Sequence, residues 1–323
     1  MKIQKTLLIA SMGLILATSC KKNKAVEPVE PETPTTPVTP TGDAAALSNY
    51  FTNNVNNYKQ NFTIDASSTQ SITGTDGTVV TFYANSFQTL SGGAVSGNID
   101  IELIEAYSKS DMILLNKPTV AFSTAGTDYA PLISGGEFNI EVSQNGQELT
   151  LKPGWSYNAS VQAPNGVDPN MDLFYGVSQN DTIIWEQSDS SQIFGQGNAY
   201  DCYFDSINWI NCDYFYSNPG PQTNVEVEIP EGFTNQTCMV FVSFDGLNSI
   251  TSFYNYSNGV YSSGPSYQLP VGLEVHFVAV SFIGGNPHVS IVPATITNGH
   301  HEVLPALVQT TEAQFEADLV ALP

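Results

Sequence analysis

Residues 71–87 read SITGTDGTVVTFYANSF, and this stretch decides the fold class. Asp76-Gly77 is a turn signal of the kind that joins two antiparallel strands. The residues after the turn alternate between two faces, with Val79, Thr81 and Tyr83 on one and Val80 and Phe82 on the other. Successive side chains of a strand point to opposite faces, so this period of two predicts a β-hairpin.

The same pattern recurs at short intervals along the chain. Asn145-Gly146 is a second strong turn signal and separates two alternating runs. Charged residues are only 12 %, and the abundant Thr, Ser, Asn, Gly and aromatic residues suit strands and polar turns better than helices. Short strands at regular spacing are typical of β-sandwiches. We expect them at 98–107, 135–144, 147–152, 157–163, 182–186, 224–229, 237–244, 250–256, 273–282 and 288–297.

Helical spacing is found only near the two ends. Asp43 is placed to cap a first helix, in which the apolar positions are Leu47, Phe51, Val55 and Tyr58. Thr311 and Gln314 form a capping-box pattern that opens a last helix, whose apolar face is Phe315, Leu319 and Leu322. The sequence therefore predicts an all-β protein of two β-sandwich domains in tandem, with short N- and C-terminal helices.

The N-terminal residues MKIQKTLLIASMGLILATSCKKNK have the order of an export signal. Lys2 and Lys5 precede the apolar run 7–17, which at eleven residues is shorter than the roughly 20 that a bilayer core requires. Residues 17–20, Ala-Thr-Ser-Cys, resemble the bacterial lipobox, in which the cysteine is diacylated before cleavage. The resemblance implies a signal peptide over 1–19 and lipidation of Cys20; the alternative is an ordinary signal peptide with an incidental cysteine.

A proline-punctuated linker, AVEPVEPETPTTPVTPTG, follows at 25–42. Repeated proline favours extended polyproline II, so residues 20–42 would be a lipidated cysteine on a semi-rigid spacer. Lipoproteins of Bacteroidetes-type bacteria that reach the cell surface often carry acidic residues at the places that Lys22, Asn23 and Lys24 fill here. We therefore expect an outer-membrane lipoprotein and favour the periplasmic face over the cell surface.

Charge excludes one class of partner. The formal net charge is −22, from 9 basic and 31 acidic residues, so the chain would repel a phosphate backbone and nucleic-acid binding is not expected. No calcium loop of the Asp-x-Asp-x-Asp-Gly kind is present. His300-His301-Glu302 is the one local histidine cluster, but neighbours on a strand face opposite ways. We predict no metal and no cofactor.

Three cysteines lie beyond Cys20, at Cys202, Cys212 and Cys238. An oxidising envelope allows disulfides, and the odd number leaves one thiol over. The spacing of Cys202 and Cys212 is one that a hairpin could bridge, and Cys238 lies in an alternating run where a buried, inert thiol is expected. A bridge between Cys212 and Cys238 is the open alternative.

Several motifs resemble a recurrent β-sandwich of Bacteroidetes-type lipoproteins that is distantly similar to the ZU-type domain of zona-occludens scaffolds and netrin receptors. They are Gly77-Thr78, residues 84–87 (Ala-Asn-Ser-Phe), 97–103 (Gly-Asn-Ile-Asp-Ile-Glu-Leu), 110–114 (Ser-Asp-Met-Ile-Leu) and 134–138 (Ser-Gly-Gly-Glu-Phe). Residues 209–213, Trp-Ile-Asn-Cys-Asp, match a further family run, with Tyr214 in place of its arginine. The resemblance implies a non-catalytic interaction module, with a ZU-like domain over 43–165, a connecting segment over 166–200 and a second sandwich over 201–323.

No nucleophile elbow, zinc-protease helix, Walker loop or dinucleotide fingerprint occurs, so no catalytic residue is predicted. Exposed aromatic rings are a common means of docking sugars and proteins. The candidates are Tyr203, Trp209, Tyr214 and Tyr216, with a second group at Tyr254, Tyr256 and Tyr261; the alternative is that they alternate into the core. Asp181-Thr182-Ile183 and Asp205-Ser206-Ile207 resemble a bacterial O-glycosylation signal, which implies modification at Thr182 and Ser206.

The expected function is that of a membrane-anchored, non-catalytic binding or structural module of the cell envelope, not an enzyme. Its partners would be the membrane, through the N-terminal lipid, and an envelope protein or glycan. Two alternatives remain. A glycan-binding surface lipoprotein would present its tyrosines as a flat exposed strip, and an envelope hydrolase would require a cleft with converging carboxylates or a histidine.

Overall fold

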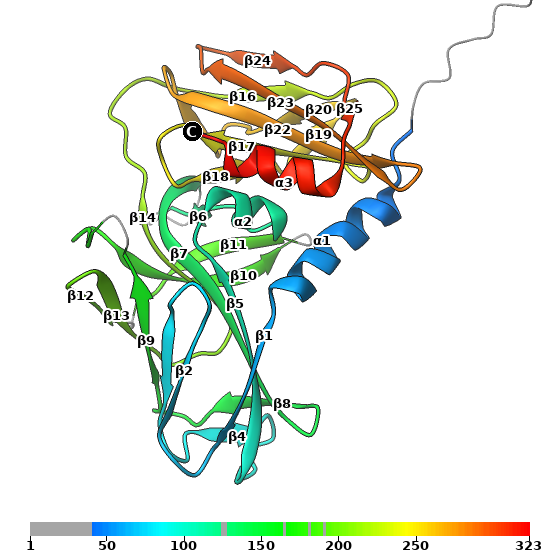
Figure 1. The fold of residues 1–323 in the computed structure, drawn as a ribbon. Helices are drawn as coiled ribbons and strands as arrows, with labels where there is room; N and C mark the ends of the chain where they lie inside the picture. Colours follow the sequence, from blue (N-terminus) through cyan, green and yellow to red (C-terminus); the bar gives the residue numbers. More distant parts are fainter. Residues whose placement is uncertain (1–40, 124–127, 164–165, 180–181, 190–191) are drawn as a thin grey trace, which may run out of the picture. The chain divides into compact units, whose positions relative to one another are not determined.

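The computed structural model describes residues 41–123, 128–163, 166–179, 182–189 and 192–323 (Figure 1). Cys20 and nearly all of the proline-rich linker lie outside the described residues, so the lipidation of Cys20 stays a prediction. The structure is mostly β, with 51 % strand and 11 % helix, as the alternating sequence predicts. No helix in the described ranges is long and apolar enough to cross a membrane.

The largest sheet has nine strands. Seven of them follow the order β1-β5-β7-β14-β10-β11-β6, and β8 extends from β7 to β4. Their bounds are β1 (Gln60–Asp65), β4 (Phe87–Thr89), β5 (Asn98–Ala106), β6 (Val120–Phe122), β7 (Tyr129–Gln144), β8 (Gln147–Leu151), β10 (Asp172–Gln179), β11 (Thr182–Gln187) and β14 (Trp209–Phe215). β7 and β8 are joined at Asn145-Gly146, both at positive φ, so the predicted hairpin is confirmed.

A five-stranded sheet packs on this one and follows the order β12-β13-β9-β3-β2. The strands are β2 (Gln70–Thr73), β3 (Val79–Phe82), β9 (Tyr157–Gln162), β12 (Gln192–Gln196) and β13 (Ala199–Phe204). β2 and β3 are the hairpin predicted from residues 71–87, with Val80 and Phe82 buried as the alternation requires. A core cluster that contains Val80, Ile101 and Phe138 lies between the two sheets.

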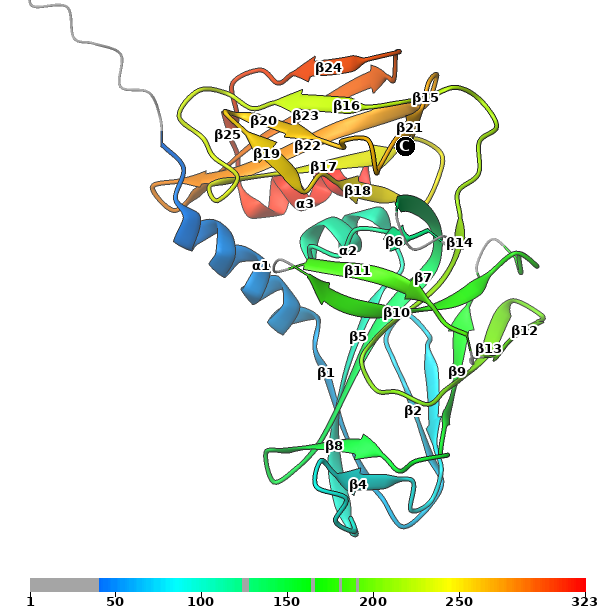
Figure 2. The same ribbon diagram turned by 180° about the vertical axis from the view of Figure 1, so that it is seen from behind.

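The C-terminal half forms further sheets (Figure 2). A five-stranded sheet, in the order β18-β17-β22-β23-β25, comprises β17 (Cys238–Phe244), β18 (Ile250–Ser252), β22 (Glu274–Ile283), β23 (Asn286–Thr295) and β25 (Val308–Gln309). A four-stranded sheet, in the order β19-β20-β16-β24, comprises β16 (Val225–Glu228), β19 (Asn255–Ser257), β20 (Val260–Ser262) and β24 (His300–Val303). A short ribbon pairs β15 (Gln222–Thr223) with β21 (Leu269–Pro270).

The boundary expected at residue 201 divides strands that the structure pairs. β13 joins β9 in the five-stranded N-terminal sheet, and β14 lies between β7 and β10 in the nine-stranded sheet. Strand pairing passes from the N-terminal to the C-terminal sheets between Phe215 and Gln222. Backbone pairing decides membership of a sheet, and it leaves no local mark in the sequence.

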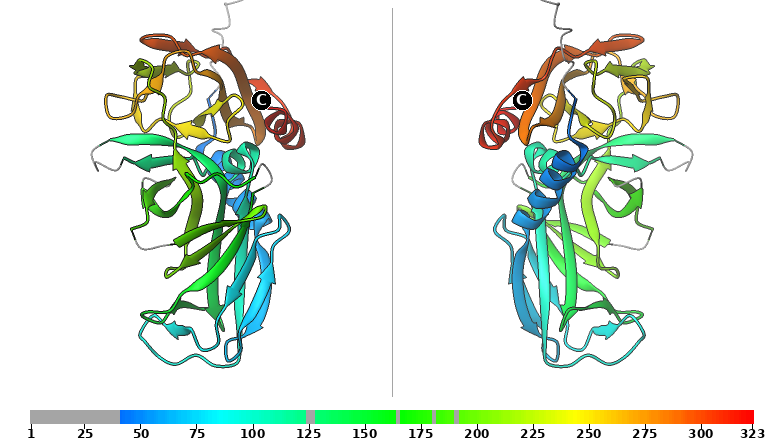
Figure 3. Two further views of the ribbon diagram at one scale, coloured as in Figure 1. Left: turned by 90° about the vertical axis from the view of Figure 1, so that its left-hand side faces the viewer. Right: turned by 90° about the vertical axis from the view of Figure 1, so that its right-hand side faces the viewer.

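Three helices cluster beside the β17–β22–β23 region (Figure 3). α1 (Ala44–Tyr58) begins at the predicted cap, where Asp43 accepts from the Ala46 N–H at 3.0 Å, and α3 (Glu312–Val320) begins at Thr311. α2 (Lys109–Leu114) was not expected from spacing; a capping box of Ser108 and Asp111 starts it. One apolar cluster joins Tyr50 of α1, Ile113 of α2 and Phe315 of α3.

Candidate functional site

A cavity of about 870 Å³ lies between α1 and a group of tyrosines, and we call it the α1–tyrosine cavity. Its volume is within the range typical of small-molecule sites. One wall is the apolar face of α1, and the opposite wall comes from β17 to β20. The residues that line the cavity include Phe51, Asn116, Lys117, Thr182, Tyr256 and Tyr261.

The α1 wall follows from the 3.6-residue period of the helix. Leu47, Phe51 and Val55 fall on one face at spacings of four, and all three line the cavity. Leu47 is 3 % exposed and also belongs to the core, whereas Phe51 packs edge-on against Phe241 with ring centroids 6.2 Å apart. The backbone N–H of Asp43 donates to the Phe282 carbonyl at 2.7 Å, which ties the start of the helix to β22. These contacts fix the α1 wall of the cavity against the neighbouring strands.

The tyrosine wall is a short hairpin. β19 and β20 are joined by Asn258-Gly259, both at positive φ, the two-residue turn that the right-handed twist of strands favours. The turn sets Tyr256 directly opposite Tyr261, and their rings lie 5.0 Å apart. The Tyr261 hydroxyl donates to the Cys238 carbonyl at 2.7 Å. An aromatic wall of this kind offers both a ring face and nearby polar edges.

The polar part of the cavity is placed by the C-terminal end of α2. The Lys117 N–H donates to the Met112 carbonyl and the Asn116 N–H to the Ile113 carbonyl, which is the Schellman pattern. Asn116 occupies the left-handed position of that motif, at φ 54°. Asn54 of α1 donates to the Leu114 carbonyl at 3.1 Å and fixes α1 to the same end.

Two buried oxygen atoms in this wall have no hydrogen-bond partner among the described residues. They are Asn116 Oδ1 and Thr182 Oγ1, and Thr182 is 7 % exposed. Buried polar atoms in proteins are nearly always paired, because an unpaired one costs about 1–3 kcal/mol. Both residues belong to the lining of the cavity. Neither residue could have been found from sequence spacing, although the second tyrosine group pointed to the opposite wall.

A second cavity, of about 730 Å³, is lined by Tyr107, Ser134, Met171 and Tyr214 among others. Ser134 connects this cavity to the buried side chain of Asn211. The Ser134 hydroxyl donates to Asn211 Oδ1 at 3.0 Å. The Asn211 amide in turn lies 2.5 Å from an Asp213 oxygen and 3.4 Å from a Glu137 oxygen. One amide therefore serves two carboxyl groups.

Both carboxyl groups are fully buried, at 0 % exposure. Burial raises the pKa of Glu137 well above its usual range, and the neighbouring Asp213 adds to the rise. Burial likewise raises the pKa of Asp213, against the lowering effect of hydrogen bonds from Ser134, Asn211 and the Gly135 backbone. Asp213 forms no ion pair within 4.0 Å in the described part of the chain, consistent with tyrosine at position 214 where the resembled family has arginine.

The four aromatic residues first proposed as a strip lie in different surroundings. Tyr203 is 39 % exposed on β13, whereas Trp209 is 9 % exposed and packs under the Lys117 ammonium, 5.0 Å from its ring centroid. Tyr214 lines the second cavity. Tyr216 packs against Phe244 with ring centroids 6.0 Å apart. They do not share one face, because β13 and β14 belong to different sheets.

The three cysteines in the described ranges, Cys202, Cys212 and Cys238, are free and buried. Cys202 and Cys212 lie close together, as their pairing requires, but not within a hairpin: β13 and β14 do not pair with each other. Cys238 lies in a different core cluster, so the alternative bridge to Cys212 has no support. Burial raises the pKa of Cys238 to about 12, which agrees with an inert thiol.

The two candidate O-glycosylation residues differ in accessibility. Ser206 is exposed in the connection between β13 and β14. Thr182 begins β11 and turns its side chain inside, so the folded chain does not present its hydroxyl to a glycosyltransferase. Modification of Thr182 would require an unfolded substrate.

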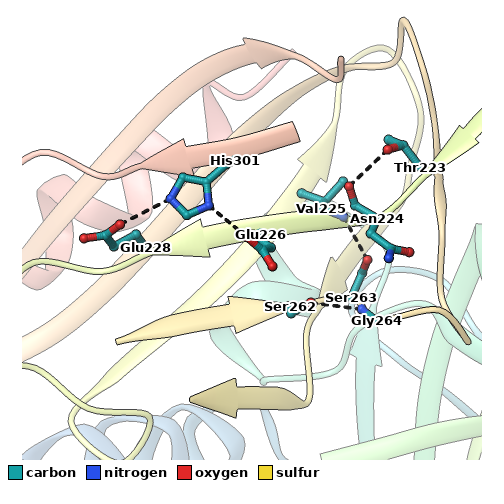
Figure 4. Close-up of polar contacts among 9 residues, drawn as sticks. All are labelled: Thr223, Asn224, Val225, Glu226, Glu228, Ser262, Ser263, Gly264 and His301. Carbon is teal, nitrogen blue, oxygen red and sulfur yellow. Dashed lines mark hydrogen bonds and ion pairs between the residues drawn. The ribbon is translucent and has the colours of Figure 1, made fainter. Parts of the chain in front are cut away.

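His300 and His301 point to opposite faces of β24, as predicted. His300 is buried and stacks on Phe277, with ring centroids 5.5 Å apart. His301 lies on the outer face between Glu226 and Glu228, at 3.0 and 3.2 Å (Figure 4). This arrangement clamps β24 to the parallel strand β16. In the ranges that the structure describes, no group of three His, Cys, Asp or Glu side chains is arranged to hold a metal ion.

No protein-family model matches the chain, and no curated protein matches it. The resemblance to the ZU-type sandwich therefore stays a prediction from the motifs alone.

Proposed function

We propose that the protein is a lipid-anchored, non-catalytic binding module of the bacterial cell envelope, and that the α1–tyrosine cavity holds its ligand. The ligand class that fits the wall best is a carbohydrate. The observation that carries the proposal is the pair of buried, unpartnered oxygen atoms of Asn116 and Thr182, two residues that line the same cavity as the tyrosine hairpin.

The chemistry of the wall supports a sugar. Tyr256 and Tyr261 provide aromatic surface for the apolar face of a sugar ring, and the amides of Asn235 and Gln236 stand beside them in the lining. Asn116 and Thr182 provide polar atoms for its hydroxyl groups. We therefore propose that a glycan binds in the α1–tyrosine cavity and not on an exposed strip of tyrosines.

A hydrolytic function has less support. Among the described residues that line the two cavities there is no histidine and no pair of side-chain carboxylates. Glycoside hydrolysis canonically uses two carboxyl groups on either side of the bond. The buried pair Glu137 and Asp213 lies outside both linings.

We also propose how the protein is anchored and how its domains are arranged. We place the protein at the outer membrane, on its periplasmic face, through lipid on Cys20 and the linker over 25–42. We also propose two sandwiches in tandem: the cluster that contains Val80 and Phe138 comes entirely from the chain up to Cys212, and most members of a second cluster, such as Val227 and Phe277, come from the C-terminal strands. Metabolic labelling with palmitate tests the anchor: wild type incorporates the label, and Cys20→Ala does not.

A glycan array with the detergent-solubilised full chain tests the binding function, and Thr182→Val is its sharpest variant. The substitution removes a hydroxyl that has no partner in the free protein, so stability should hold or rise by about 1 kcal/mol while glycan binding weakens at least fivefold. Ser290→Ala removes another buried, unpartnered hydroxyl outside the cavity and is the matched control. Retention of full glycan affinity by Thr182→Val, or binding of no glycan at all, would count against the proposal.

A further inference from the structure

Lys117 is a cation in the wall of the α1–tyrosine cavity. Its backbone is fixed by the Schellman motif that ends α2, and its ammonium lies 5.0 Å from the centroid of the Trp209 ring. Trp209 is itself 9 % exposed, so the charge lies against an apolar surface instead of water. Burial lowers the pKa of Lys117, as expected of an ammonium that has lost part of its hydration.

Lys117 forms no ion pair with a carboxylate in the described part of the chain. Within the described residues no carboxylate oxygen lies within 4.0 Å of its ammonium; the ion pairs at that distance involve Lys59, His276, His300 and His301. The acid that acts on it from farther away is Glu137. Burial raises the pKa of Glu137 well above its usual range, and the charge of Lys117 opposes that rise.

An unpaired, partly desolvated cation is unusual in a chain with 31 acidic residues and a net charge of −22. Most lysines avoid such a position because burying a charge without a partner costs several kcal/mol. The cost is recovered when a ligand brings the opposite charge. Asn116 and Thr182, which carry the two unpartnered oxygen atoms, line the same cavity as Lys117.

We propose that the ligand of this cavity is a sugar that carries a carboxylate, and that Lys117 is the residue that binds the carboxylate. The inference rests on the carbohydrate-binding function proposed above and specifies its substrate class. A carboxylate carries a single charge, which one lysine matches. A phosphate carries up to two, and proteins meet it with arginine forks or several cations, whereas this chain has no arginine.

The test compares oligogalacturonate with the same oligosaccharide after methyl esterification, which removes the negative charge of each carboxyl group and adds a methyl group. Binding to the full chain in detergent is measured by calorimetry, at low salt. We expect the acid form to bind at least tenfold more tightly than the ester. Lys117→Gln should abolish the difference and Lys117→Arg should retain most of it.

Lys152→Gln is the matched control, because it removes the same charge at a residue whose ammonium donates to the Asn85 carbonyl, away from the cavity. It should leave the preference unchanged. Thermal unfolding of each variant tests whether the fold is kept. An array of acidic and neutral sugars extends the comparison beyond galacturonate.

The outcomes separate the two proposals. Equal binding of acidic and neutral sugars, sensitive to Thr182→Val, would overturn the role of Lys117 and leave the carbohydrate function standing. Loss of the acid preference in Lys152→Gln to the same extent as in Lys117→Gln would also overturn it. Absence of binding by acidic and neutral sugars alike would overturn both.

Discussion

The sulfur atoms of Cys202 and Cys212 lie 3.7 Å apart, although their strands belong to different sheets. β13 ends at Phe204, and the chain crosses from the five-stranded to the nine-stranded sheet before β14 begins at Trp209. Both cysteines point into the core between these sheets. A covalent bond here would fasten one layer of the sandwich to the other.

Under oxidising conditions we expect these two cysteines to form a disulfide. Closing a loop of about ten residues should stabilise the fold by roughly 3 kcal/mol. The Cys202 hydrogen bond and burial raise the pKa of Cys212, so the thiolate is scarce in the folded chain and oxidation should occur during folding. Peptide mapping without reductant, after oxidative refolding, should recover residues 202 and 212 cross-linked. Cys238→Ala should not affect the link, and recovery of only free thiols would contradict the expectation.

Glu137→Gln should stabilise the protein at neutral pH. The folded-state pKa of Glu137 is raised, so above about pH 4 the unfolded chain loses this proton while the folded chain keeps it, and stability falls as pH rises. The slope is about 1.4 kcal/mol for each pH unit until the folded group also titrates. Urea unfolding from pH 4 to 8 should show the variant equal to wild type at the acid end and increasingly more stable than wild type as the pH rises. Glu148→Gln, at an exposed position, should leave the profile unchanged.

Glu105→Gln should destabilise the hairpin over residues 71–87. The Glu105 carboxylate is 1 % exposed and accepts from the Thr78 and Asp76 backbone N–H groups, at 2.9 and 3.0 Å, and from Gln60. An amide in its place must turn an N–H₂ toward one of these donors, at a cost of about 3 kcal/mol. Gln60→Ala removes one donor to Glu105 and the acceptor of the exposed Thr75 N–H, and should cost about 1 kcal/mol by the same unfolding measurement. Equal effects of the two variants would show that the backbone contacts are unimportant.

His301→Gln should flatten the pH dependence of stability near neutrality. Hydrogen bonds that His301 donates to the carboxylates of Glu226 and then Glu228 raise the pKa of His301, so the stabilisation of β24 is fully present below about pH 6.5 and is lost as pH rises through the folded pKa. The side chain is 40 % exposed, and solvent screening should keep the effect below about 1 kcal/mol. Chemical unfolding at pH 6 and 8 measures it. His288→Gln is the control, and an unchanged slope in His301→Gln would contradict the prediction.

Local patterns in the sequence determined the class of the fold and many of its elements. The alternation after Asp76-Gly77, the Asn145-Gly146 turn and the caps at Asp43 and Thr311 each act through neighbours in the chain, so each could be predicted. The burial of Cys238 could be predicted in the same way, because it lies in a run in which alternate residues are apolar.

Only the tertiary structure decided which strands share a sheet and which side chains share a site. β14 joined β7 and β10 because backbone pairing over long sequence separations has no local signature. The same is true of the cavity, where the end of α2 brings Lys117 and the start of β11 brings Thr182 against Tyr261 of a distant hairpin. Sequence could mark these residues as polar, charged or aromatic, but whether each would find a partner depended on which surfaces packed together.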